Sequence, residues 1–209
     1  MYSKQHPILA VAADRLPDAT RSTSFIPLSE NELWSTLYRA GLWIGPRAQL
    51  EQMPAFRQVI PYVILKVGDR LVRYTRTEAG NEQRLHGRVS IGLGGHIDLA
   101  DMSIDQDGID LPNTLQAAAQ REVDEELTGI DSRRRQWQGL LVDNDSDVGK
   151  VHIGVVACWY LRTPPHGSQE DAIGEIGLAT LDQLHQLPQD RLETWSQLVV
   201  EWLRTQSTP

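Results

Sequence analysis

The chain has 209 residues, of which 40% are hydrophobic and 23% are charged. That composition is sufficient for one ordinary core and excludes a disordered or fibrous protein. The formal net charge of −8 argues against nucleic acid as a partner, because a polyphosphate chain binds to a basic surface.

The N-terminal residues contain one short apolar run, Ile8 to Ala12. This run is too short for a signal peptide, and no other run approaches the roughly 18 apolar residues of a membrane span. The single cysteine, Cys158, lies in an apolar stretch and is expected to be a buried hydrophobe in a reducing compartment. We therefore expect a cytoplasmic protein without a membrane partner.

Residues 29–41 predict the first helix. Ser29 and Glu32 form a capping-box pattern, and Gly41 is placed to end the helix. Four residues form an apolar stripe at helical spacing: Leu33, Trp34, Leu37 and Tyr38. We expect residues 1–55 to be an N-terminal extension packed on the core of a domain at 56–209, with a lid over the substrate or a homodimer contact as alternatives.

Strand-like runs and helices alternate through the rest of the chain. Strands are predicted at 59–68, 70–77, 87–97, 137–144 and 150–161. A polar loop at 98–112 precedes a helix that carries many carboxylates, near 117–130. Two further helices are predicted, one from Thr180 with Gln183 as its capping partner and one at 190–205 with Asp190 as its N-cap. Strands flanked by helices indicate a layered α/β fold.

The carboxylate helix carries three glutamates on one face. Glu125 and Glu126 lie three and four residues after Glu122, so the three would repel one another without a countercharge. The glycine pair Gly94 and Gly95 ends the preceding strand, where a backbone carbonyl can come close to a ligand. Carboxylate and carbonyl oxygens are the ligands that Mg²⁺ prefers, so the pattern predicts a divalent metal site.

These residues resemble the Nudix box, G-x5-E-x7-R-E-U-x-E-E-x-G-U, in which U is a bulky aliphatic residue. The matching positions are Gly95, Arg121, Glu122, Val123, Glu125, Glu126, Gly129 and Ile130. A weaker resemblance to the family extends over residues 58–188. It implies a Nudix-type α/β/α sandwich with a mixed β-sheet, to which this chain would add the helical N-terminal extension.

The chain departs from the box in its first half. Residues 96–112 occupy a gap for which the pattern has five positions, and Asn113 stands where the pattern has its first glutamate. Asn113, with Gln116 three residues later, predicts a helix N-cap. Two residues instead of one separate Glu126 from the box glycine, Gly129.

The resemblance implies metal-dependent hydrolysis of a pyrophosphate bond, with Mg²⁺ or Mn²⁺ as cofactor. The substrate would be a nucleoside triphosphate or another compound linked to a nucleoside diphosphate. By analogy with the family, Glu125 and Glu126 hold the metal, and Glu122 joins them or accepts a proton from the attacking water. The Gly95 carbonyl completes the metal site, and Arg121 orients the glutamates.

Further site residues are predicted outside the box. Many Nudix enzymes take their general base from a later loop, and the candidates here are Glu170, Asp171 and Glu175. A local surplus of basic residues lies between residues 66 and 88, in a chain that is acidic as a whole, and substrate phosphates need cationic partners. The candidates for these partners are Arg73, Arg76 and Arg88. His96 either contacts phosphate or metal or caps its loop.

Two other functions are compatible with the sequence. Isopentenyl diphosphate isomerases share the superfamily, but their catalytic cysteine precedes the box glycine, where this chain has Gly94. A Nudix-fold module that binds a nucleotide without cleaving it is the second alternative. Retention of Glu122, Glu125 and Glu126 favours catalysis over this module.

Overall fold

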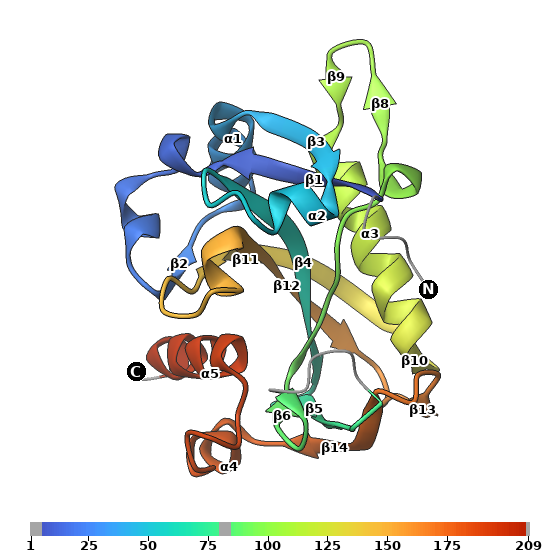
Figure 1. The fold of residues 1–209 in the computed structure, drawn as a ribbon. Helices are drawn as coiled ribbons and strands as arrows, with labels where there is room; N and C mark the ends of the chain where they lie inside the picture. Colours follow the sequence, from blue (N-terminus) through green and yellow to red (C-terminus); the bar gives the residue numbers. More distant parts are fainter. Residues whose placement is uncertain (1–5, 80–84, 208–209) are drawn as a thin grey trace. The chain divides into compact units, whose positions relative to one another are not determined.

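The computed structural model describes residues 6–79 and 85–207 (Figure 1). By their contacts, the residues fall into two units. The first unit comprises residues 1–62, 94–121 and 137–156, and the second comprises 63–93, 122–136 and 157–209. The carboxylate helix and three long strands contribute residues to both units. The mixed α/β fold predicted from the sequence is confirmed.

The first unit contains β1 (Pro7–Ala12), β2 (Ser24–Pro27), α1 (Glu30–Ala40), β3 (Leu42–Pro46), α2 (Arg47–Leu50), β8 (Ile104–Asp105) and β9 (Gly108–Ile109). It also contains parts of β4 (Phe56–Val67), α3 (Leu111–Glu126), β11 (Ser132–Val142) and β12 (His152–Leu161). The short β8–β9 hairpin projects from this unit (Figure 1).

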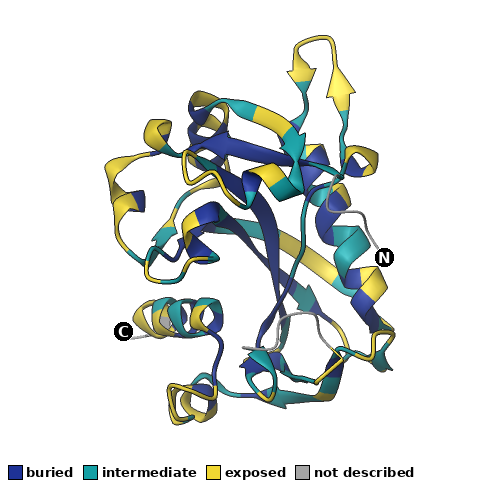
Figure 2. Ribbon diagram, viewed as in Figure 1, coloured by how far each residue is buried: buried dark blue, intermediate teal, exposed yellow. Residues whose placement is uncertain are grey.

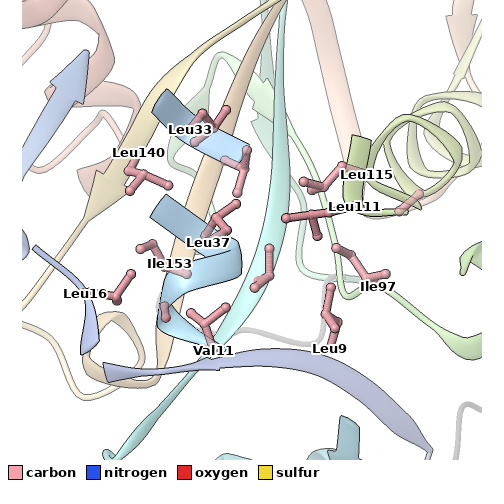
Figure 3. Packing of buried hydrophobic residues seen from close by; sticks show 14 of the residues in the cluster. Leu9, Val11, Leu16, Leu33, Leu37, Ile97, Leu111, Leu115, Leu140 and Ile153 are labelled. Carbon is pink, nitrogen blue, oxygen red and sulfur yellow. The ribbon is translucent and has the colours of Figure 1, made fainter. Parts of the chain in front are cut away.

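The apolar run at the N-terminus forms a buried strand, β1. It pairs antiparallel with β3, where Leu9 is opposite Ile44, and with β4, where Val11 is opposite Arg57. Leu9 and Val11 enter the core of the unit together with Ile97 and with Leu111 from α3 (Figure 3). The N-terminal residues therefore pack on the core of this unit, while the predicted domain boundary at residue 55 stays a prediction.

Helix α1 confirms the capping box predicted from the sequence. The Ser29 side chain accepts a hydrogen bond from the Glu32 amide, and the Glu32 carboxylate accepts one from the Ser29 amide. Leu33 and Leu37 are fully buried. Tyr38, assigned to the same apolar stripe, is instead 45% exposed, and its hydroxyl donates to the Ile109 carbonyl at 3.0 Å.

The second unit contains β5 (Arg70–Arg76), β6 (Val89–Ser90), β7 (Gly92–Leu93), β10 (Leu127–Thr128), β13 (Gly167–Ser168), β14 (Ile173–Ala179), α4 (Leu181–His185) and α5 (Thr194–Ser207). The end of β4 and the start of β5 form the predicted hairpin, with Lys66 opposite Leu71. Strand β14 pairs antiparallel with the other edge of β5. Figure 2 shows β4 and β12 buried along most of their length.

Two predicted elements of the second unit were wrong in extent. The single strand predicted at 87–97 is broken into β6 and β7, because the Ile91 amide donates to the Ser196 hydroxyl at 3.1 Å instead of to a strand. Helix α5 begins at Thr194, so Asp190 is not its N-cap. The preceding backbone is already engaged, since the Glu193 amide donates to the Val89 carbonyl at 3.0 Å.

None of the helices in the described ranges is both long and apolar enough to cross a membrane.

Candidate functional site

Helix α3 starts two residues earlier than its predicted cap. The Thr114 amide donates to the Asp110 carbonyl at 2.9 Å, so Asp110 occupies the N-cap position. The Asp110 carboxylate accepts hydrogen bonds from the Asn113 backbone amide at 3.2 Å and from its side-chain amide at 2.5 Å. The prediction of Asn113 as the N-cap was therefore wrong, because the stronger capping acceptor lies upstream.

In the first unit, Arg121 forms a bidentate ion pair with Asp101. Its Nε donates to Oδ1 at 2.9 Å and its Nη2 donates to Oδ2 at 2.8 Å. Nη2 also donates to the His96 carbonyl at 2.9 Å. The Asp101 side chain is only 5% exposed. Asp101 was not assigned to the box from the sequence, although five residues, 96–100, separate it from Gly95 as in the pattern. The predicted role of Arg121 in orienting the glutamates stays a prediction.

The first residue of the glycine pair, Gly94, must be a glycine for a steric reason. A Cβ on Gly94 would collide with the carbonyl oxygen of Pro61 in β4, so only glycine lets the two backbones approach. Gly95 follows directly and leads into His96. The metal-ligand role of the Gly95 carbonyl stays a prediction.

His96 belongs to a polar network inside the first unit. Its Nε2 lies 2.8 Å from Gln58 Oε1 and 3.3 Å from His152 Nε2. His152 Nδ1 lies 2.7 Å from the Val148 carbonyl, to which it donates. Burial, reinforced by the positive charge of Arg47, lowers the pKa of His96 to about 3. A neutral, tethered imidazole favours the loop-holding role of His96 over a charged contact with phosphate.

The three box glutamates lie in the second unit and differ in exposure. Glu125 is exposed, Glu122 is half-buried, and Glu126 is only 6% exposed. The Oε2 atom of Glu126 is buried without a hydrogen-bond partner. Burial raises the pKa of Glu126 to about 8, and the charges of Glu122 and Glu170 act in the same direction, against an opposing effect of Arg76. A cation at Oε2 would satisfy this orphaned atom.

The chemistry of these groups fits a hard divalent cation. Among the residues that the structure describes, no three histidine, cysteine, aspartate or glutamate side chains are grouped so that they could hold a metal by themselves. Mg²⁺ usually takes one or two protein carboxylates and fills its other positions with water and substrate phosphates. The buried Glu126 and its half-buried neighbour Glu122 suit such a partial site.

The arginines proposed for substrate binding have acidic partners in the second unit. Arg76 Nε donates to Glu193 Oε1 at 2.9 Å, and both side chains are largely buried, with exposed fractions of 22% and 8%. Arg73 Nη2 donates to Glu175 Oε1 at 2.6 Å. This hydrogen bond lowers the pKa of the exposed Glu175 carboxyl. Arg88 is half-buried just before β6.

Arg76 lines an open hollow of about 540 Å³ in the second unit. The hollow brings together two residues selected from the sequence, Arg76 and Glu175. Its other lining residues are Thr75, Thr77, Glu78, His86, Gly87 and Gly174. The hollow therefore presents two threonines, an arginine, a histidine and two glutamates to a small polar ligand.

The loop that carries Glu170 and Asp171 is fastened to the C-terminal end of α3, whereas Glu175, predicted in the same loop, lies in strand β14. The Gln169 amide donates to the Glu126 carbonyl at 3.0 Å, and the Gln169 side chain donates to the Asp124 carbonyl at 2.5 Å. Strands β10 and β13 pair beside these bonds. The loop places Glu170 near enough to affect the pKa of Glu126, whereas Glu175 is paired with Arg73.

The box glycine after α3 is required by the same loop. Gly129 has a φ of +73°, a conformation that other residues rarely adopt, and a Cβ there would collide with the His166 ring. The remaining base candidate, Asp171, contributes its carbonyl, which accepts a hydrogen bond from the Thr77 hydroxyl at 2.5 Å.

Cys158 is buried, with 2% of its surface exposed. Burial raises the pKa of its thiol to about 11. A neutral, inaccessible thiol is a poor nucleophile or acid catalyst, in agreement with the structural role predicted for it.

Comparisons with known proteins bear on family and fold. Protein YmaB of Bacillus subtilis strain 168 is 36% identical over 164 residues, which span 75% of this chain and 76% of YmaB. No protein-family model matches the sequence.

Two solved structures are similar in fold. The crystal structure of Tm1382, a candidate Nudix hydrolase, superposes with a TM-score of 0.75 at 23% identity and covers 96% of this chain and 99% of Tm1382. A Nudix hydrolase from Nitrosomonas europaea gives a TM-score of 0.51 at 14% identity, over 71% of this chain and 90% of that one. The chain therefore belongs to the same family as YmaB and has the Nudix hydrolase fold.

Proposed function

We propose that the protein hydrolyses a pyrophosphate bond in a nucleoside triphosphate or another compound linked to a nucleoside diphosphate, with Mg²⁺ or Mn²⁺ as cofactor. The observation that carries the proposal is the buried and unpartnered Oε2 of Glu126, in the last turn of a helix whose preceding turn carries Glu122. The fold and the sequence of the box support the same activity.

The metal ligands would be Glu122, Glu125 and Glu126, with the Gly95 carbonyl as a further ligand implied by the family. A bound divalent cation would neutralise the charge of the phosphate oxygens and would lower the pKa of a water molecule that it coordinates. The carboxylates would hold the cation, and its charge would offset the repulsion among like charges on one helix face.

Glu170 is the favoured general base. It lies on the loop fastened to the end of α3, and its charge acts on Glu126. In the reaction, the water oxygen forms a bond to phosphorus, the bridging P–O bond breaks, and Glu170 accepts the proton released by the water. Glu175 is disfavoured, since its ion pair with Arg73 lowers its pKa and makes it a weaker base.

Substrate phosphates would be contacted by arginines of the second unit. Arg76 has the strongest support, because it lines the hollow and its charge acts on Glu126. Arg73 and Arg88 stay predicted contacts, whereas for His96 the loop-holding role is favoured. The buried Cys158 argues against the isomerase alternative, which needs a reactive cysteine. The chain would act on a small molecule in the cytoplasm.

The test is release of phosphate from a panel of nucleoside triphosphates and sugar nucleotides, with and without Mg²⁺ or Mn²⁺. We expect turnover of at least one compound that depends on metal and is abolished by Glu126→Gln. Gln183→Ala, far from the box in the sequence, is the matched control and keeps activity. Binding of panel members without any turnover would contradict the proposal and favour a non-catalytic nucleotide-binding module.

A further inference from the structure

Counted from its glycine, Gly95, the Nudix box of this chain has a carboxylate at the first acidic position. The pattern requires five residues between the glycine and the first glutamate, and residues 96–100 separate Gly95 from Asp101. Counting backwards from Arg121 leads instead to Asn113, because twelve additional residues lie between the two halves of the box. If the additional residues come before the first acidic position, that position is Asn113. If they come after it, the position is Asp101.

The contacts in the first unit favour Asp101. Both of its carboxylate oxygens accept hydrogen bonds from the Arg121 guanidinium, at 2.9 and 2.8 Å, and Oδ2 also accepts one from the Asp98 amide at 2.9 Å. A bidentate, charge-assisted pair of this kind is strong and directional. Asn113 instead directs its side-chain amide to Asp110.

The additional residues form a hairpin that returns to its starting point. The Asp110 amide donates to the Ser103 carbonyl at 2.9 Å, and the Ser103 amide donates to the Thr114 hydroxyl at 3.0 Å. Between these residues, β8 and β9 pair with each other, and Ile104 is 72% exposed. The insertion therefore follows Asp101 and enters α3 without displacing the carboxylate from Arg121.

Arg121 connects Asp101 to two segments that are next to proposed metal ligands along the chain. The Arg121 guanidinium also donates to the His96 carbonyl, in the residue that follows Gly95, and Arg121 itself directly precedes Glu122 in α3. Loss of the Asp101 charge would leave a largely buried guanidinium with one fewer anionic partner. Both the peptide after Gly95 and the helix turn before Glu122 would then lose a constraint.

We infer that Asp101 is a positioning residue that supplies the first carboxylate of the box, and that the β8–β9 hairpin is an insertion placed after it. The inference rests on the proposed function in one respect: it assigns Asp101 a supporting role in metal-dependent hydrolysis. Its structural part, the dependence of residues 96–100 and of metal binding on the Asp101 charge, can be measured without turnover.

The catalytic test compares four variants on a substrate found in the panel. Asp101→Asn should lower kcat by about 10- to 100-fold and raise the Mn²⁺ concentration needed for half-maximal rate, with a smaller change in KM. Asp101→Glu, which restores the residue of the family pattern, should keep most of the activity. Asn113→Ala should behave as the unaltered protein, and Asn113→Glu should not rescue Asp101→Asn.

Two measurements separate this inference from the proposed function. Calorimetric titration with Mn²⁺ should show weaker binding to Asp101→Asn than to Asp101→Glu, whether or not a substrate is known. Hydrogen exchange of residues 96–100 should be faster in Asp101→Asn and in Arg121→Lys, which cannot form the bidentate pair, but unchanged in Asn113→Ala. Equal exchange in all variants, or rescue of Asp101→Asn by Asn113→Glu, would overturn the assignment.

Discussion

Arg76 and Glu193 form a largely buried ion pair, with 2.9 Å between Nε and Oε1. Arg76→Met would leave the Glu193 carboxylate buried without its partner and should lower the free energy of unfolding by about 3–5 kcal/mol. The double variant with Glu193→Gln should recover much of that loss, because no buried charge remains. Urea unfolding of the single and double variants measures the difference, and a double variant no more stable than Arg76→Met would contradict it.

The raised pKa of Glu126 predicts a pH dependence of stability in the metal-free protein. The folded carboxyl titrates at about 8, while its ordinary value is 4.5. Between these values the unfolded chain has released a proton that the folded protein retains, so the free energy of unfolding falls as the pH rises from about 4.5 to about 8. Glu126→Gln cannot titrate and should lack this contribution to the slope.

Urea unfolding at pH 5, 6.5 and 8 measures this effect. Addition of Mn²⁺ at pH 8 should stabilise the unaltered protein, because a cation replaces the proton at Glu126. The same addition should stabilise Glu126→Gln less. Identical pH slopes in the two proteins would show that Glu126 does not carry the effect.

The two candidate bases Glu170 and Glu175 should differ in their effect on the rate. Glu170→Gln should lower kcat by about 10²- to 10⁴-fold with little change in KM, as expected for loss of a general base. Glu175→Gln removes only the exposed partner of Arg73 and should change kcat by no more than about threefold. The pH–rate profile of Glu170→Gln should also lose its acidic limb. A large loss in Glu175→Gln with normal activity in Glu170→Gln would reverse the assignment.

The β8–β9 hairpin should be removable without loss of hydrolysis. Replacing residues 104–109 by Asn-Gly would join Ser103 and Asp110, whose backbones already pair, by a favourable two-residue turn. We expect the unfolding free energy to fall by about 1–3 kcal/mol, since Ile109 packs against the core, while kcat and KM stay near their original values. Ile104→Ser, at the most exposed position, is the control. A loss of kcat in the trimmed protein alone would assign the hairpin a direct role.

Features fixed by local contacts were predictable from the sequence. The capping boxes at Ser29 and Thr180 depend on residues three positions apart, and both are present. The hairpin between β4 and β5 is likewise local. Short-range hydrogen bonds need no knowledge of the tertiary structure, so the pattern alone is sufficient for them.

Features that depend on distant partners were missed. Residues 8–12 carry no strand signal beyond their apolar character, and β1 exists because β3 and β4 pair with it. Helix α5 starts later than predicted because the Glu193 amide is hydrogen-bonded to the Val89 carbonyl. Asp101 was not assigned to the box for a related reason: an insertion separates it from Arg121 along the chain but not in space. The roles of the three box glutamates stay predictions, supported most directly by the burial of Glu126.

The bonds from Gln169 to the Asp124 and Glu126 carbonyls have a thermal consequence. The final carbonyls of a helix lack partners within it, and helix ends are where local melting begins. Here the loop whose Gln169 caps these carbonyls also carries Glu170. Warming that frees Gln169 would loosen the last glutamate turn and the base together, so catalytic inactivation should precede global unfolding as the temperature rises.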